Sequence, residues 1–184
     1  MPANTTKTAK QEGLPPAHAG AIVDLLNSRA YSSLTDKLDT PESAAAVLRP
    51  FGHQGDVVPP GQLELVRSVR ADLLDLVTDP DAAPSWARLT SRVSQITYQQ
   101  EFSAPAQVHL HQVTGDPVVG RIIQAVAALV AEGNWSRLRY CANDECSEVF
   151  YDTTRSRTRR WHSYEYCGNR TNVAAHRARH SVPS

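Results

Sequence analysis

The three cysteines of this 184-residue chain all lie near its C-terminal end, and a histidine lies among them. The first pair has the spacing Cys-x4-Cys, and fifteen residues later a second pair has the spacing His-x4-Cys. A structural zinc ion takes four Cys or His ligands in a tetrahedral arrangement. Three thiols and one imidazole meet that requirement, whereas any disulfide scheme leaves one cysteine unpaired. The spacing therefore predicts one structural zinc ion held by Cys141, Cys146, His162 and Cys167.

The spacing also predicts how the chain around these four residues folds. The first two cysteines can lie on a turn, and residues 148–152 after them alternate like a short strand. His162 and Cys167 cannot share one face of a regular helix, because five residues rotate by roughly 140° around it. We therefore expect His162 just before a helix, Ser163 as its N-cap and Cys167 in its first turns. A hairpin pair and a helix-start pair together are typical of a treble-clef-like finger.

Other histidines offer alternatives. His176 and His180 are four residues apart near the C-terminus, and either could replace His162 as the fourth ligand. His109 and His111 share one face of a predicted strand, but the sequence suggests no third ligand for a metal there. We interpret both pairs as surface residues.

The predicted metal site is closed. Four protein ligands leave no position for water or substrate, and catalytic zinc normally keeps one. The sequence also has no phosphate-binding glycine loop, nucleophile elbow or HExxH motif. We therefore expect that the protein is not an enzyme and that the zinc ion folds a segment with too little core to fold alone.

Charge is distributed unevenly along the chain. Residues 1–136 carry 10 Lys and Arg against 14 Asp and Glu, whereas residues 137–184 carry nine arginines against five acids. A neutral protein with one basic end is expected to make local phosphate contacts. Arginine suits this role because its planar fork matches phosphate and guanine edges. The candidate nucleic-acid contacts are polar residues between and after the metal ligands: Arg155, Arg157, Arg159, Arg160, Asn169, Arg170 and Arg177.

The basic end has a second interpretation, as a solvated surface or as a set of partners for the acidic part of the chain. Tyr151 and Trp161 likewise have two interpretations. They could stack on bases, but aromatic residues beside a small zinc site more often form its core.

The rest of the chain is predicted to be mainly helical. Thr40-Pro41 and Asp116-Pro117 mark helix beginnings. Alternating residues over 96–102 and 108–110 predict an antiparallel hairpin, which must lie on helices or extend a sheet because a short hairpin is marginal alone. The predicted helices span about 17–30, 41–50, 62–77, 85–93 and 117–133. The expected fold class is mainly α with a small antiparallel β-hairpin.

Three segments follow from these patterns: a flexible tail over residues 1–15, a helical domain with the hairpin over 16–135, and the finger over 136–184. The N-terminal sequence lacks the apolar region of a secretory signal, and no run of about 18 apolar residues occurs. We expect a cytoplasmic protein with no membrane contact, and there clustered cysteines are more often metal ligands than disulfides.

The segment from Arg139 to Arg179 resembles the CGNR zinc-finger family, whose name matches Cys167-Gly168-Asn169-Arg170. The preceding run RYCANDECSEVFYDTTRSRTRRW also resembles the finger of that family. Members generally carry an N-terminal ABATE domain and are described as stress-induced transcription regulators. The order of helices and hairpin over residues 17–133, with DLLN at Asp24–Asn27, agrees with that domain. One departure is His162, where the family usually has cysteine.

The resemblance implies a bacterial transcription regulator. In this hypothesis the finger binds DNA, and the N-terminal domain senses a small-molecule effector or forms a homodimer. The alternative is a protein–protein interaction module with a structural zinc site and a ligand-binding N-terminal domain.

Overall fold

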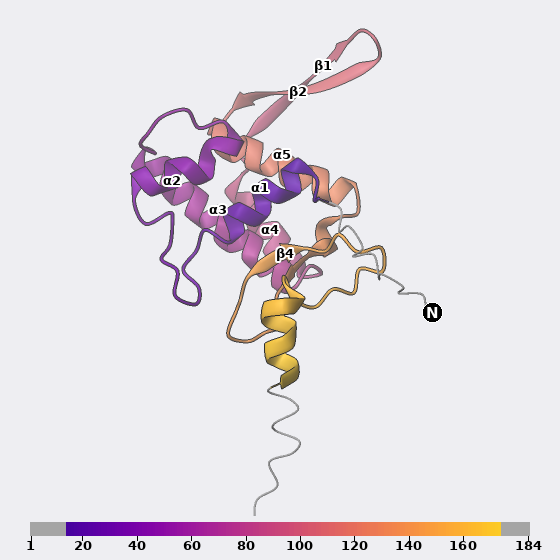
Figure 1. Ribbon diagram of the computed structural model, residues 1–184. Coiled ribbons are helices and arrows are strands. Elements are labelled where there is room, and N and C mark those ends of the chain that lie inside the picture. The colour runs from indigo at the N-terminus through magenta and orange to yellow at the C-terminus, as the bar shows by residue number, and fades with distance from the viewer. Residues whose placement is uncertain (1–13, 174–184) are drawn as a thin grey trace, which may run out of the picture.

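The computed structural model describes residues 14–173, which are mostly helical with two small antiparallel hairpins (Figure 1). The main helices are α1 (Ala17–Leu26), α2 (Pro41–Leu48), α3 (Pro60–Thr78), α4 (Ala83–Arg92) and α5 (Pro117–Ala131). One hairpin pairs β1 (Thr97–Ser103) with β2 (Gln107–Thr114), and the other pairs β3 (Leu138–Tyr140) with β4 (Val149–Tyr151). The predicted fold class is confirmed.

Short turns complete the chain. These are η1 (Arg49–Phe51), η2 (Trp135–Arg137) and η3 (Tyr164–Gly168), and η3 is a wide turn that opens a helix continuing to residue 173. Residues 1–13 of the predicted tail lie outside the described residues. No helix within residues 14–173 has the length and apolar character needed to cross a membrane.

Two helices begin at the capping signals present in the sequence. The Thr40 hydroxyl accepts a hydrogen bond from the Ser43 N–H, and Pro41 occupies the first position of α2. The Asp116 carboxylate accepts from the N–H groups of Val118 and Val119 at the start of α5. These side chains satisfy backbone donors that the first helical turn leaves without partners.

Helix α1 lies in the middle of the fold, against α2, α3, α5 and β4 (Figure 1). Its apolar residues at helical spacing, Ala19, Ile22, Leu25 and Leu26, are fully buried. Each of the three larger side chains, Ile22, Leu25 and Leu26, stabilises the fold by roughly 1.5–3 kcal/mol. The helical core is therefore built around α1.

Carboxylates of the helical part are already paired within that part. Asp36 binds Arg70, whose guanidinium is buried and also donates to the Ser28 hydroxyl. The buried Asp72 on α3 binds Arg88 and Arg92 on α4. These two acids hold loops and helices of the same part together. Their ion-pair partners therefore come from the helical part and not from the C-terminal segment.

The β1–β2 hairpin projects away from the helices (Figure 1). It is anchored to α5 by the Tyr98 hydroxyl, which donates to the Gly120 carbonyl at 2.7 Å, and by the Gln124 side chain, which donates to the Leu110 carbonyl at 3.4 Å. Phe102, Val108 and Leu110 share one face of the hairpin and are 75%, 53% and 52% exposed. The prediction that the hairpin lies on helices or extends a sheet is therefore wrong for the part beyond these contacts with α5. Alternation identified an apolar face, but it could not show what covers that face.

The β3–β4 hairpin, in contrast, joins the main core. Trp135, Leu138 and Val149 belong to the same buried cluster as the helices. The Asn27 side chain at the end of α1 pairs with the Val149 backbone in both directions, at 2.7 and 2.8 Å. The backbone of β4 is thus hydrogen-bonded to the Asn27 side chain at the end of α1. This contact fixes the position of the metal-ligand cluster relative to the helices.

Candidate metal centre

The four predicted ligands come together in space. The ligand atoms of Cys141, Cys146, His162 and Cys167 all lie within 4.8 Å of one another. A tetrahedral zinc ion with bonds of about 2.0–2.3 Å keeps its ligand atoms roughly 3.5–3.8 Å apart. His162 Nδ1 lies 3.3 Å from the Cys146 sulfur and 3.8 Å from the Cys167 sulfur. The Cys3His cluster is therefore suited to a single zinc ion.

Backbone hydrogen bonds hold each ligand pair in place. The Cys146 N–H donates to the Asn143 carbonyl at 2.8 Å, which closes the turn between the first two cysteines. At the other pair, the Ser163 hydroxyl accepts from the Tyr166 N–H and caps the helix, as its position before the helix predicts. The Cys167 N–H donates to the Ser163 carbonyl at 3.0 Å. A turn and a helix start therefore face each other across the cluster, as the finger prediction requires.

Glu148 contacts the ligand histidine from outside the cluster. His162 directs Nδ1 toward the thiols, and its Nε2 lies 3.3 Å from the Glu148 carboxylate. A carboxylate on the second ring nitrogen fixes the ring orientation and raises the basicity of the coordinating nitrogen. Sequence reasoning missed this residue, since nothing in a single glutamate before β4 predicts that contact.

The environment of Cys146 keeps its thiol protonated while no cation is bound. Burial and the neighbouring Cys167 and Cys141 thiols raise the pKa of the Cys146 thiol to about 12. A zinc ion reverses this preference, because metal-bound sulfur is the thiolate. Zinc binding must therefore release protons, and affinity is expected to fall as pH is lowered.

Comparison with known families supports this geometry. A family model described as CGNR zinc finger matches residues 137–180, and no curated protein matches the chain. Residues 137–180 are a CGNR zinc finger. The match does not extend to residues 16–135, for which the ABATE interpretation stays a prediction.

Gly168 belongs to the Cys-Gly-Asn-Arg quartet that gives the CGNR finger its name, and close neighbours leave no room for a larger residue at this position. A Cβ atom at Gly168 would lie 2.7 Å from Cδ2 of Tyr164 and 3.2 Å from the Trp161 ring. The two rings pack edge to face with centroids 5.8 Å apart. Gly168 therefore allows the Trp161 and Tyr164 rings to pack against the helix directly beside the ligand Cys167. The next residue, Asn169, is exposed.

Several arginines of the CGNR finger hold its own backbone. Arg137 donates to the carbonyls of Asp152 and Thr154, and Arg139 donates to the Arg157 carbonyl. Arg159 is half-buried and donates to the Trp161 carbonyl at 2.8 Å. It also donates to the His162 carbonyl. The arginine predicted at position 159 for nucleic acid therefore has a supporting role beside the metal ligand.

Asp152 is the centre of this arginine-rich loop and is fully buried. Its carboxylate accepts hydrogen bonds from the backbone N–H and the hydroxyl of Thr154. It also accepts one from the backbone N–H of Arg159 at 2.9 Å. Arg139 adds an ion pair at 3.5 Å. Burial acts to raise the pKa of Asp152, but these hydrogen bonds and Arg139 lower that pKa below its ordinary value. The signal for this residue was present in the sequence, because Asp before Thr-Thr favours an Asx-type turn.

The remaining candidate contacts lie at the surface. Arg155, Arg160 and Arg170 are exposed, and the Arg160 guanidinium lies 5.1 Å from the centroid of the Trp161 ring. Arg157 is also exposed and donates to the Gly133 carbonyl at 3.2 Å. Arg177 lies outside the described residues, as do His176 and His180. The structure therefore separates supporting arginines from arginines that face solvent.

The aromatic candidates divide in the same way. Tyr151 is half-buried on β4, packs against the main core, and lies under the Arg137 guanidinium. Trp161 is half-buried beside Tyr164, which is 60% exposed. Tyr151 is therefore part of the finger's core, and the Trp161–Tyr164 pair reaches the surface.

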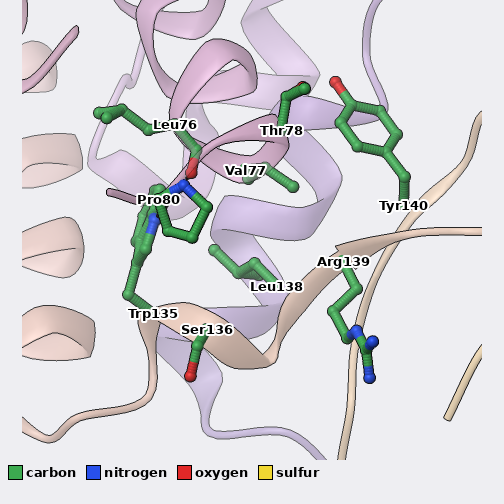
Figure 2. A pocket seen from close by; sticks show the side chains of 9 residues that line it. All are labelled: Leu76, Val77, Thr78, Pro80, Trp135, Ser136, Leu138, Arg139 and Tyr140. Carbon is green, nitrogen blue, oxygen red and sulfur yellow. Dashed lines mark hydrogen bonds between the residues drawn. The ribbon is translucent and has the colours of Figure 1, made fainter. Parts of the chain in front are cut away.

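A surface pocket of about 330 Å³ lies where the end of α3 meets η2 and β3 (Figure 2). Figure 2 shows Trp135 and Pro80 on one side, Tyr140 on the other, and Leu138 between them. The Trp135 indole N–H donates to the Leu76 carbonyl at 3.2 Å, which fixes that wall. The pocket therefore has walls from both the helical part and the CGNR finger.

The metal-ligand assignment makes a direct prediction. Substituting His162→Ala should weaken zinc binding far more than His176→Ala, because His162 supplies the nitrogen of the cluster. Substituting Glu148→Gln should weaken it by roughly 10- to 100-fold, as loss of an outer partner of a ligand histidine does. Competition with a chelator of known affinity measures all three values. Equal effects of the two histidine substitutions would contradict the assignment.

Proposed function

We propose that the protein is a DNA-binding transcription regulator whose CGNR finger contacts phosphates. The observation that supports it most is the exposure of Arg155, Arg160 and Arg170 on a module folded around a metal cluster. No ion pair is described for these three within residues 14–173. Exposed guanidinium groups of this kind suit phosphate oxygens, to which they can donate two parallel hydrogen bonds.

The zinc ion has a structural role in this proposal. Cys141, Cys146, His162 and Cys167 would hold it, and a bound ion draws the β3–β4 turn and the final helix together. Four protein ligands leave no position on the metal for substrate. The proposal therefore assigns no enzymatic activity to the zinc site.

The helical part is proposed to sense a signal or to dimerise. The pocket in Figure 2 supports sensing, because its lining residues come from both α3 and β3. A small molecule bound there would contact the helical part and the finger together. Such a ligand could shift the finger only by binding two arrangements of this junction with different affinity.

The proposal predicts DNA binding that falls steeply with salt, because phosphate contacts release counterions. Arg155→Gln, Arg160→Gln and Arg170→Gln should each weaken binding and reduce the slope of log affinity against log salt by about one. Arg49→Gln is the matched control, since Arg49 is an exposed arginine of the helical part. Fluorescence anisotropy with a labelled duplex measures these slopes. Binding that ignores salt, or no binding, would contradict the proposal.

A protein-interaction module is the second candidate function. The projecting β1–β2 hairpin favours it, because Phe102, Val108 and Leu110 expose an apolar face that a partner could cover. Affinity capture would separate the two candidates. Enrichment of one protein without nucleic acid would favour the interaction module, provided that Phe102→Ser abolishes the capture.

A further inference from the structure

A second, smaller pocket lies on the CGNR finger beside the ring pair. Its volume is about 290 Å³, just below the range of about 300–1,000 Å³ that holds drug-sized ligands. A pocket of this size suits one flat ring system rather than a large molecule. Its lining residues are Thr154, Thr158, Arg159, Arg160, Trp161 and Tyr164.

The lining has the chemistry that proteins use to hold unpaired bases. Trp161 and Tyr164 meet edge to face at an interplanar angle of 70°, and Tyr164 is 60% exposed. The Arg160 guanidinium lies over the Trp161 ring, which adds a flat cationic group to the aromatic surface. Single-stranded nucleic acids bind by stacking their bases on such rings and guanidinium planes.

The polar part of the lining selects for the same ligand. Thr158 contributes a hydroxyl group and Arg160 contributes N–H donors, whereas the Thr154 hydroxyl already donates to Asp152, and the lining includes no carboxylate. Nucleobases present carbonyl and ring-nitrogen acceptors at their edges, and the attached phosphate is an anion. Arg155 follows Thr154 directly and is exposed, so a cation lies at the edge of this wall.

The walls of the pocket are fixed before any ligand binds. The buried Asp152 carboxylate holds both Thr154 and Arg159. Arg159 in turn binds the carbonyl of Trp161, and Gly168 lets the Trp161 ring close against the helix. A ligand therefore does not have to order this pocket, and that lowers the entropy cost of binding.

We infer that this pocket holds an unpaired base of the bound DNA strand, an inference that rests on the proposed DNA binding. In a fully paired duplex each base face is covered by its stacked neighbours, and extruding a base costs a few kcal/mol. A bulged or single-stranded base avoids that cost. The finger therefore prefers DNA with an extrahelical or single-stranded base to the same sequence fully paired.

The test uses the full zinc-loaded chain and three labelled probes in anisotropy measurements: a duplex, the same duplex with one bulged base, and the single strand. The bulged and single-stranded probes are expected to bind roughly 5- to 150-fold more tightly than the duplex, the range that stacking of one base provides. Tyr164→Ala should remove this advantage. Tyr166→Ala is the control, because Tyr166 is 72% exposed on the same helix and does not line the pocket.

A second variant tests the pocket independently, in case Tyr164→Ala does not fold. Thr158→Phe fills the pocket from an exposed loop position and should also remove the preference for unpaired bases. Equal affinity for all three probes, or an equal loss on all probes in Tyr164→Ala and Thr158→Phe, would overturn the base pocket and leave the proposed function standing. Displacement of the strand by AMP at equal concentration would assign the pocket to a free nucleotide instead. Absence of binding to every probe would overturn both proposals.

Discussion

Removal of zinc is expected to unfold the CGNR finger and to destabilise the helical part with it. Structural zinc contributes about 10–16 kcal/mol in isolated finger peptides, so residues 139–173 should lose their structure when a chelator removes the ion. Here β4 also packs on α1, and Val149 is fully buried in the main core. Loss of β4 would expose the end of α1 and leave the Asn27 side chain without its backbone partner.

Hydrogen exchange with and without chelator measures this effect. Protection should disappear from β3, β4 and η3, and it should fall in α1 more than in α2, which packs farther from the finger. Readdition of zinc should restore both. Full protection of α1 in the chelated protein would show instead that the helical part and the finger fold independently.

Among polar residues of the finger other than the metal ligands, Asp152 is expected to give the most destabilising single substitution when changed to alanine. It removes a fully buried carboxylate, leaves the Thr154 donors and the Arg159 backbone N–H without their acceptor, and removes the ion pair of Arg139. Loss of one partner from a buried charged network costs about 3–5 kcal/mol. Chemical denaturation of the zinc-loaded protein measures the change in free energy of unfolding. Asp144→Ala is the matched control, because Asp144 is exposed in the same finger and should change stability by less than about 0.5 kcal/mol.

The same carboxylate makes part of the stability dependent on pH. The pKa of Asp152 in the folded protein lies below its ordinary value of 3.8, so its ionised form favours folding. This contribution is complete well above pH 3.8 and is lost as pH falls below that value. With zinc in enough excess to keep the cluster occupied, the stability difference between the wild type and Asp152→Asn should therefore narrow as pH falls from 5 toward 3. A difference that stays constant over this range would show that the charge of Asp152 does not stabilise the fold.

The features that the sequence predicted correctly depend on interactions between residues close together in the chain. Thr40-Pro41 and Asp116-Pro117 predicted helix starts because a cap acts on backbone groups two or three residues away. Ser163 was placed before the final helix for the same reason. Residue type and spacing also brought the four metal-binding groups into one predicted cluster, and the structure places them within 4.8 Å of one another.

The role of each arginine could not be read from the sequence. Arg159 and Arg160 are adjacent, yet the first binds the carbonyl of Trp161 and the second lies over its ring at the surface. This difference arises from the loop that Asp152 holds, because the loop turns one side chain inward and its neighbour outward. Charge counting treats both residues alike.

Residues of the chain alone were enough to predict the Cys3His cluster, the mainly helical fold and the basic character of the C-terminal end. These depend on residue type and periodicity, which are properties of the chain. Three features became visible only in the folded chain: β4 shares a core with α1, the β1–β2 hairpin projects from the helices, and Glu148 orients His162. Each of these features depends on which segments distant in the sequence pack together, and local residue patterns carry no information about that packing.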